Sequence, residues 1–181
     1  KNDGAQERMR IDSSGNVLMQ GGSPEFHFGT TSASHANWRI ACQEFVDQGF
    51  EIASGTTSAG SGAMGDTYTT RFVILSDGKV GIGDTNPDNK LDVDFDITGE
   101  GSQEGGIKIQ NSHGVNNDFA PLYFGVHGGT RRTKAAIGLK RTGSYGIGDL
   151  VFAMDANGDD ANVTFANDEV MRITSAGKVG I

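Results

Sequence analysis

A short pattern that recurs three times constrains the fold of this chain more than any other feature. Each copy begins with alternating apolar residues, passes through small polar residues to a glycine, and ends on a polar residue and valine. This order predicts a strand, a tight turn and a returning strand, with glycine where the turn needs positive φ. The copies span 8–17, 71–80 and 170–179. Their pattern residues are Met9, Ile11, Gly15, Val17, Phe72, Ile74, Gly78, Val80, Met171, Ile173, Gly177 and Val179.

The spacing of the copies indicates variable inserts between standard hairpins. The gap between the second and third copies is much longer than the gap between the first and second, which excludes a solenoid of short fixed period. Short echoes occur in the same order in both inserts, so we expect the inserts to share one strand plan with loops of different length. The echoes pair Phe28-Gly29 with Phe124-Gly125, 39–41 with 136–138, and 50–53 with 151–153.

These repeats predict three modules. Residues 1–22 would end an upstream module, 23–84 would form a first β module, and 85–181 would form a second one. The chain starts at Lys1 without an initiator methionine or signal peptide, and it stops at Ile181, inside a repeat. We therefore expect an interior segment of a longer protein that continues into another module.

Alternation of apolar and polar residues predicts further strands. Leu91–Ile97 alternates with aspartates, Ile107 and Ile109 flank Lys108, and 68–75 is rich in β-branched and aromatic residues. The segment 37–47 also favours a strand, because its apolar residues alternate. No apolar stripe at helical spacing exceeds two turns. Polar, glycine-rich stretches predict loops at 54–66 and 98–106.

Composition agrees with an all-β fold that needs a partner surface. The chain has 28 glycines but only 3 prolines, which fits many tight turns and argues against collagen. Hydrophobic residues make up only 35%, a low share for a self-sufficient globule. Self-association is the simplest way to complete the core.

Charge and cysteine content exclude several classes of protein. The net charge of −8 argues against nucleic-acid binding, which depends on cationic contacts with phosphate. We interpret Arg131, Arg132 and Lys134 as a solvated loop. Cys42 is the only cysteine, so it forms no intrachain disulfide and is expected to be a small buried residue. The chain has no apolar run long enough for membrane insertion.

The repeat and its continuation resemble a known family. The segments 7–17, 79–93 and 169–181 are similar to the "ERMRI-s-GNVGIGT-x-P-x-KLxV" segments of phage tail-fibre and tailspike-like proteins. The fullest version runs from Arg71 through Val80-Gly81-Ile82-Gly83 to Asn86-Pro87 and Lys90-Leu91-Asp92-Val93. The motif covers about a fifth of the chain. The first copy departs from it, because Val17-Leu18-Met19-Gln20 replaces Val-Gly-Ile-Gly.

The resemblance implies an elongated all-β fibre of short strands and hairpins, built as an intertwined or side-by-side parallel homotrimer. It also implies an extracellular place on the virion, contact with other tail, baseplate or fibre proteins, and a role in host attachment, with host-surface glycan as a conceivable receptor. Such segments often precede a self-cleaving chaperone domain of the endosialidase type. In a trimer, the apolar residues of 91–95 and 171–173 could be buried mutually.

Two other functions stay open. A bacterial adhesin or surface filament could use the same module, and a depolymerase tailspike would cleave polysaccharide. The second would need a pair of carboxylates in a cleft, and spacing selects no pair among the available glutamates. We therefore predict no enzymatic activity, no catalytic residue and no cofactor. The glutamates considered are Glu25, Glu44, Glu51, Glu100 and Glu104.

Several strings resemble binding motifs without completing them. Gly60-x-Gly62-x-x-Gly65 lacks the helix that a dinucleotide site requires. Asp155-x-Asn157-x-Asp159 begins like an EF-hand, but Asp160 and Ala166 replace the required glycine and glutamate. An acidic surface turn is preferred there over a calcium site, and a solvated face is preferred for the aspartates of 92–96. The four histidines lack metal-binding spacing, although a threefold axis could gather one from each chain. We predict no metal.

Receptor contact, if present, would use variable loops. The candidate loops are 54–66, 113–118 and 127–134. Aromatic residues such as Trp38, Tyr123 and Tyr145 could stack on sugars, with burial in a core or interface as the alternative. The candidate contact residues are Trp38, His127, Arg131, Arg132 and Tyr145.

Overall fold

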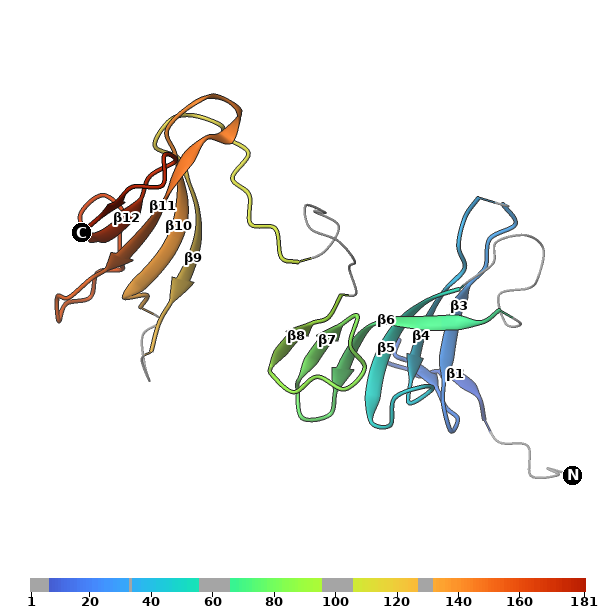
Figure 1. Ribbon diagram of the computed structural model, residues 1–181. Helices are drawn as coiled ribbons and strands as arrows, with labels where there is room; N and C mark the ends of the chain where they lie inside the picture. Colours follow the sequence, from blue (N-terminus) through green and yellow to red (C-terminus); the bar gives the residue numbers. More distant parts are fainter. Residues whose placement is uncertain (1–6, 33, 56–65, 96–105, 127–131) are drawn as a thin grey trace, which may run out of the picture. The chain divides into compact units, whose positions relative to one another are not determined.

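The computed structural model is all-β, as the sequence predicts (Figure 1). It describes residues 7–32, 34–55, 66–95, 106–126 and 132–181. Within these ranges the regular structure consists of strands and one 3-10 turn, Ser144–Gly146. The strands form a two-stranded hairpin, a six-stranded sheet and a five-stranded sheet.

The chain divides into two compact units, Lys1–Ile107 and Lys108–Ile181. The first unit holds the hairpin of β1 and β2 and the sheet of β3 to β8, whose strands lie in sequence order. All neighbours in that sheet are antiparallel except β7 and β8, which are parallel. The bounds are β1 Met9–Ile11, β2 Val17–Met19, β3 Glu25–Phe28, β4 Trp38–Cys42, β5 Gly49–Gly55, β6 Tyr68–Leu75, β7 Val80–Ile82 and β8 Leu91–Val93.

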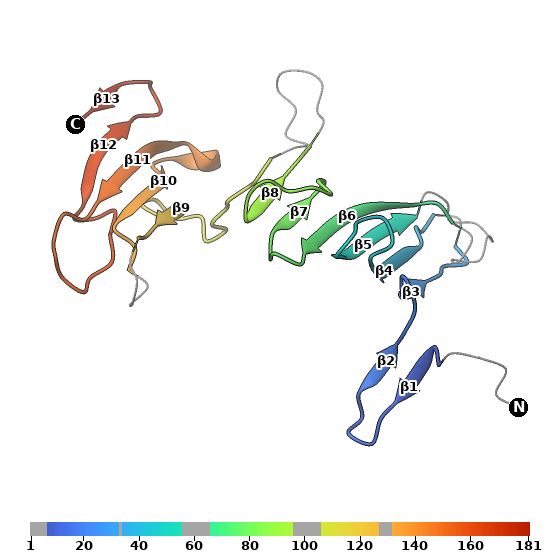
Figure 2. The same ribbon diagram turned by 90° about the horizontal axis from the view of Figure 1, so that it is seen from below.

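The second unit is an antiparallel meander in which each strand pairs with the next (Figure 2). The sequence placed the module boundary at 84/85, which is wrong, because β8 completes the first sheet by pairing with β7. The bounds are β9 Phe119–Phe124, β10 Ala135–Arg141, β11 Gly148–Met154, β12 Glu169–Ile173 and β13 Val179–Gly180.

The two sheets share one strand plan. Strands β3 to β7 correspond in order and direction to β9 to β13, and the echoes noted above lie on equivalent strands. Both sheets even carry a register shift at the same place, between Ile52 and Ala53 in β5 and between Phe152 and Ala153 in β11. The expected common plan is therefore present in the structure.

The three repeat copies form the same hairpin. In each, the glycine N–H donates to the carbonyl three residues earlier, and that earlier residue donates its own N–H to the carbonyl four residues later. This is a type I turn followed by a left-handed residue. Gly15, Gly78 and Gly177 have φ of 84°, 78° and 76°, a region that residues with a Cβ rarely adopt.

The motif that follows the second hairpin builds the short connection between parallel strands β7 and β8. A Cβ on Gly81 would collide with the carbonyl oxygen of Asp84, and one on Gly83 would collide with that of Asp94. Pro87 is fully buried, and Lys90 Nζ donates to the Asp77 carbonyl at 2.6 Å. Each signature residue thus has a structural role in a tight turn back to the sheet.

Some predicted strands are shorter than expected. The strand predicted over 91–97 ends at Val93, and the one around Lys108 does not form, because residues 107–110 belong to none of the sheets. Within 37–47, only Trp38–Cys42 is extended. Residues 43–48 form the connection to β5. The predicted loops at 54–66 and 98–106 fall mostly outside the described residues.

Each sheet has two chemically different faces. One face is covered by the chain's own connections and contains the small buried core. In the second unit that core comprises Ala136, Val151, Ala153, Val163 and Phe165. This covered side also holds most of the buried charged groups, and for that reason we call it the polar face, although it contains the apolar core. The opposite side, the apolar face, is described below.

Candidate functional site

The apolar face of the six-stranded sheet consists of two rows of apolar side chains that cross the strands. Side chains opposite one another on adjacent strands lie on the same face of a sheet. The first row is Phe26, Ile40, Ile52, Phe72, Ile82 and Val93. The second row is Cys42, Phe50, Ile74, Val80 and Leu91. Phe26 and Leu91 are 51% and 57% exposed, so the described residues of the first unit do not cover these rows fully.

The sheet of the second unit carries equivalent rows. Leu122, in the edge strand β9, is 49% exposed, and Leu139, in the interior strand β10, is 45% exposed. The first row is Leu122, Ile137, Phe152 and Met171, and the second is Ala120, Leu139, Leu150, Ile173 and Val179. Apolar areas of this extent mark interaction surfaces in soluble proteins.

The polar face of the first unit is organised by the buried carboxylate of Glu51. Its Oε1 accepts hydrogen bonds from the backbone N–H groups of Glu44, Phe45 and Val46 at 2.9–3.1 Å. Its Oε2 accepts one from the Thr70 hydroxyl at 2.9 Å. Glu51 is 0% exposed, so these donors replace the water that the carboxylate loses. The connection between β4 and β5 is thereby folded onto the sheet.

Arg39 is the second buried charge of this face. Its guanidinium lies between the rings of Phe45 and Tyr68, 4.6 and 4.7 Å from their centroids, and Nη1 pairs with Glu25 Oε1 at 3.1 Å. Nε and Nη2 are buried without a protein partner. His27 bridges Glu25 and the Tyr68 hydroxyl. Among the glutamates considered for catalysis, Glu25, Glu44 and Glu51 therefore bind this arginine or the backbone, and Glu100 and Glu104 lie outside the described residues.

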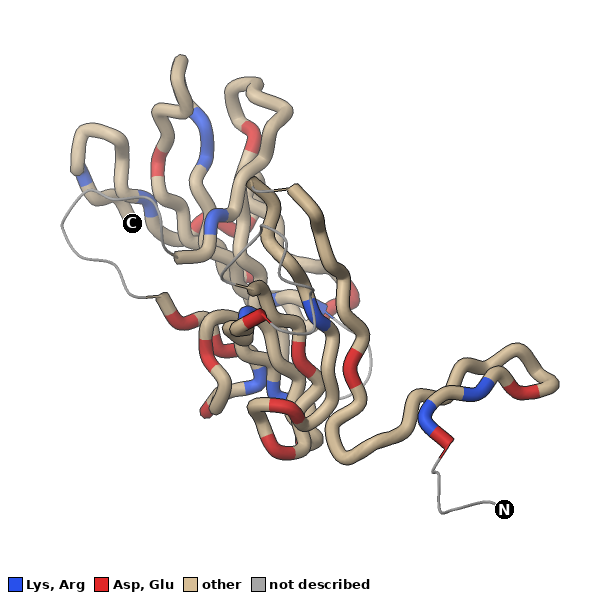
Figure 3. Tube along the Cα trace, turned by 90° about the vertical axis from the view of Figure 1, so that its right-hand side faces the viewer, with Lys and Arg blue, Asp and Glu red and all other residues tan. Residues whose placement is uncertain are grey.

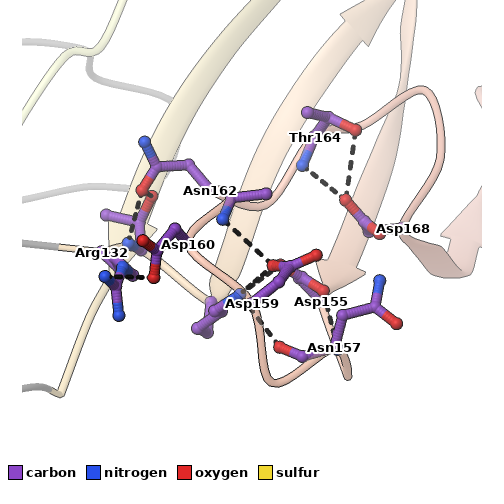
Figure 4. A network of polar contacts seen from close by, with 11 residues as sticks. Arg132, Asp155, Asn157, Asp159, Asp160, Asn162, Thr164 and Asp168 are labelled. Carbon is purple, nitrogen blue, oxygen red and sulfur yellow. Dashed lines mark hydrogen bonds and ion pairs between the residues drawn. The ribbon is translucent and has the colours of Figure 1, made fainter.

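In the second unit, Asp155, Asn157 and Asp159 of the motif that resembles the start of an EF-hand lie close together (Figure 4), and their oxygens contact a lysine ammonium. Lys134 Nζ lies 2.6 Å from Asp155 Oδ2, 3.0 Å from the Asn157 carbonyl oxygen and 3.2 Å from Asp159 Oδ1. These hydrogen bonds lower the pKa of Asp155 and raise that of Lys134. Residues 156–162 of this turn are exposed, as predicted for an acidic surface turn, and the Lys134 ammonium lies where a cation would be expected.

The neighbouring basic residue is also paired. Arg132 contacts Asp160, and the backbone N–H of Thr133 donates to Asn162 Oδ1 at 3.0 Å. Arg132 and Lys134 are therefore partly exposed and also paired with the acidic connection between β11 and β12, so the loop expected to be solvated is solvated only in part. Figure 3 shows acidic and basic residues interspersed along the trace.

The candidate receptor residues lie in different settings. Trp38 is in strand β4 on the apolar face, opposite Phe28, and is not in a loop. Tyr145 is fully exposed at the tip between β10 and β11, where its φ of 56° is unusual for a residue other than glycine. Tyr123 lies in β9, 6.3 Å from the Phe165 ring. His127 and Arg131 lie outside the described residues, as does the Gly60–Gly65 string.

A third ionic group joins β12 to β11 in the second unit. Arg172 Nη1 lies 2.8 Å from Asp149 Oδ2, and its Nε donates to Glu169 Oε1 at 2.7 Å. The pKa of Asp149 is lowered first by the backbone N–H of Ser175 and then by Arg172. Arg172 also holds the pKa of Glu169 below its usual range. The third hairpin is thus attached by charge as well as by backbone pairing.

The sequence reasoning missed two features of these surfaces. It did not anticipate that Arg39 and Glu51 are buried, although both alternate with apolar residues within predicted strands, which was the available signal. It also recognised only part of the apolar rows. Over the described residues, no cluster of three His, Cys, Asp or Glu side chains could bind a metal ion. The same part of the chain contains no helix long and apolar enough to cross a membrane.

Comparisons with protein families and with curated protein sequences gave no match to this chain. The argument for function therefore depends on the geometry of the sheets, the hairpins and their two faces.

Proposed function

We propose that this chain is a structural and adhesive segment of a phage tail fibre, assembled as a homotrimer that extends from the virion and contributes to host-surface attachment. The observation that carries the proposal is the duplicated sheet, whose apolar face is left about half exposed by the described residues of each unit. A chain that repeats the same sheet, with the same hairpin at its end, is suited to building length by repetition.

The uncovered area supports association with other chains. Phe26, Phe28, Trp38 and Phe50 are each about half exposed, which leaves about 350 Å² of aromatic surface open if each ring offers about 150–250 Å². That alone matches the largest apolar patch of a typical monomer. The rows of aliphatic residues extend the same surface.

The motif residues support the resemblance to tail fibres. Gly81, Gly83, Pro87 and Lys90 each serve the tight crossover between β7 and β8. The motif is therefore a structural device for ending one sheet, and such a device suits a modular shaft. The exposed ring of Tyr145, on a strained turn, is the best-placed candidate for contact with a receptor.

The solution mass and shape of the full 181-residue chain test the proposal. Light scattering combined with sedimentation velocity should give the mass of three chains and a frictional ratio typical of an elongated particle. A compact folded monomer would contradict the proposal, because the apolar faces would then need no partner chain.

A further inference from the structure

We infer that copies of this chain meet through the apolar faces of both sheets, so that the loop-covered polar faces point outwards. The partner is a second copy of the same chain, and the surface is defined by the rows through Phe26–Val93 and Cys42–Leu91 and by their equivalents in the second unit. The inference rests on the proposed self-association and assigns the surface that mediates it.

The chemistry of the rows favours protein over other occupants. Every row residue in the first unit is aliphatic, aromatic or cysteine, and none is charged. The interface cores of proteins are likewise poor in charge and rich in aromatic residues. A shallow hollow of about 490 Å³ on this face, beside Cys42, Phe50 and Ile74, offers space for side chains of the facing molecule.

Charge favours a second copy at this face and disfavours one at the polar face. The chain has a net charge of −8, so contact between identical charged surfaces would bring like charges together. The apolar rows avoid that repulsion, because their own side chains are uncharged. The polar faces already satisfy Glu51, Lys134 and Arg172 within the chain, and the two unpartnered Arg39 nitrogens are buried beneath the surface.

The repetition of the rows favours self-association over a foreign partner. Both sheets present a first row that includes Ile40 or its equivalent Ile137, and a second row that includes Ile74 or its equivalent Ile173. In a closed symmetric assembly, the surfaces that meet belong to identical copies of one chain. A chain that carries the same face twice can make that contact twice.

This assignment separates interface residues from receptor candidates. Trp38 and Cys42 lie on the apolar face and belong to the interface, so Trp38 is removed from the receptor contacts expected from the sequence. Tyr145 lies in no row and stays available. The chain has one tryptophan and one cysteine, which makes both residues native probes of the same surface.

The first experiment uses these two probes in the unaltered chain. In the assembled state, Cys42 should react slowly with a maleimide and Trp38 should emit at shorter wavelength. Dilution that dissociates the assembly, as measured by light scattering, should at the same time speed the labelling of Cys42 and shift the Trp38 emission to longer wavelength. Fast Cys42 labelling in an intact assembly would overturn the inference while leaving the trimer proposal standing.

The second experiment uses a matched pair of substitutions. Phe50→Glu together with Ile74→Glu should reduce the mass from that of the assembly to that of one chain, with an unchanged β-type circular dichroism spectrum. Tyr145→Glu introduces one of these two charges at an exposed aromatic position outside the rows and should leave the mass unchanged. If the row variant stays assembled, the inference is wrong.

A monomeric unaltered chain would contradict both the inference and the proposed function. If that monomer also protects Cys42, the face is covered within one chain rather than by a copy.

Discussion

The two units share a backbone plan but place opposite chemistry at the centre of the polar face. In the first unit, buried Glu51 lies opposite buried Val73, whereas in the second unit buried Val151 lies opposite Arg172. Charge and apolar residue have exchanged strands, yet strand order, bulge position and hairpin are the same. The shared plan therefore comes from the turns and the apolar rows, which both units keep.

The covering connections explain why different centres are tolerated. In the first unit, the connection between β4 and β5 is held by hydrogen bonds to Glu51. In the second unit, Val163 and Phe165 from the connection between β11 and β12 pack on the core that includes Val151. A connection held by hydrogen bonds from its backbone needs a carboxylate in the sheet beneath it. A connection that packs apolar side chains on the sheet needs an aliphatic residue there. The sheet below supports either.

Exchange of the central residue in the second unit should have the largest effect. Val151→Glu would bury a carboxylate against Val163 and Phe165. The cation opposite, Arg172, is already paired with Asp149 and Glu169, so we expect the second unit to lose about 4 kcal/mol, or its fold altogether. Amide hydrogen exchange during chemical unfolding can report the two units separately. Val151→Ala is the control, with an expected loss of about 2 kcal/mol. Equal stability of the two variants would show that charge is tolerated there.

The reverse exchange should be severe but smaller. Glu51→Val leaves three backbone N–H groups of the 44–46 turn without their acceptor, so the first unit should lose about 3 kcal/mol, since each unsatisfied buried donor costs about 1–3 kcal/mol. The amide protons of Glu44, Phe45 and Val46 should lose their protection from exchange. Glu51→Gln keeps one acceptor oxygen and should preserve much of it. Unchanged protection in the valine variant would mean that the carboxylate does not hold the turn.

Equivalent glycines after the second and third hairpins provide a finer comparison. Gly81→Ala forces a Cβ against the Asp84 backbone and Val73, and we expect a loss of about 2 kcal/mol. Gly180 occupies the same position in the motif but has no atom within 4 Å of an added Cβ, so Gly180→Ala should change stability by less than about 0.5 kcal/mol. Thermal unfolding of the two variants measures the difference. Similar losses would show that the crossover does not need the close approach at Gly81.

Local patterns predicted most of the fold. The repeated glycines identified the three hairpins, because a positive φ at Gly15, Gly78 and Gly177 is a local requirement. The faint echoes identified the common strand plan, since equivalent strands conserve side-chain alternation. The prediction of a strand around Lys108 was wrong. Alternation describes a single strand, whereas a sheet also requires a neighbouring strand, and the described part of the chain offers no such strand to this segment.

The polar sites could be predicted only in part. The turn at Asp155–Asp159 was interpreted as an acidic surface turn rather than a calcium site. Its contact with Lys134, which immediately precedes β10, could not be predicted, because sequence distance hides it. Glu51 was considered only as an available carboxylate for catalysis, because its backbone partners carry no side-chain signature. The trimer and the tail-fibre role stay predictions, as do the candidate receptor contacts.

Acid should reveal the smallest of the expected differences between the units. It concerns the turn around the Lys134 ammonium in the second unit. Hydrogen bonds from Lys134 lower the pKa of Asp155 in the folded state, so its contribution to stability is present above the unfolded pKa of about 3.9. That contribution is lost as pH falls through the lower folded pKa. We therefore expect the unfolding midpoint of the second unit to decrease below about pH 4.

The variant Lys134→Met should make this acid dependence shallower. It removes the hydrogen bond that contributes most to the lowered pKa of Asp155 and leaves only the hydrogen bonds from Asn157. It should also destabilise the second unit at pH 7, where Asp155 and Asp159 would lose their cation. Lys178→Met removes an exposed lysine from the third hairpin and should change neither property. A Lys134→Met chain with an unaltered pH profile would show that Asp155 is held by the backbone of the turn alone. The ammonium would then be only a neighbour, and Asp155, like Glu51 in the first unit, would be a carboxylate held by backbone N–H groups.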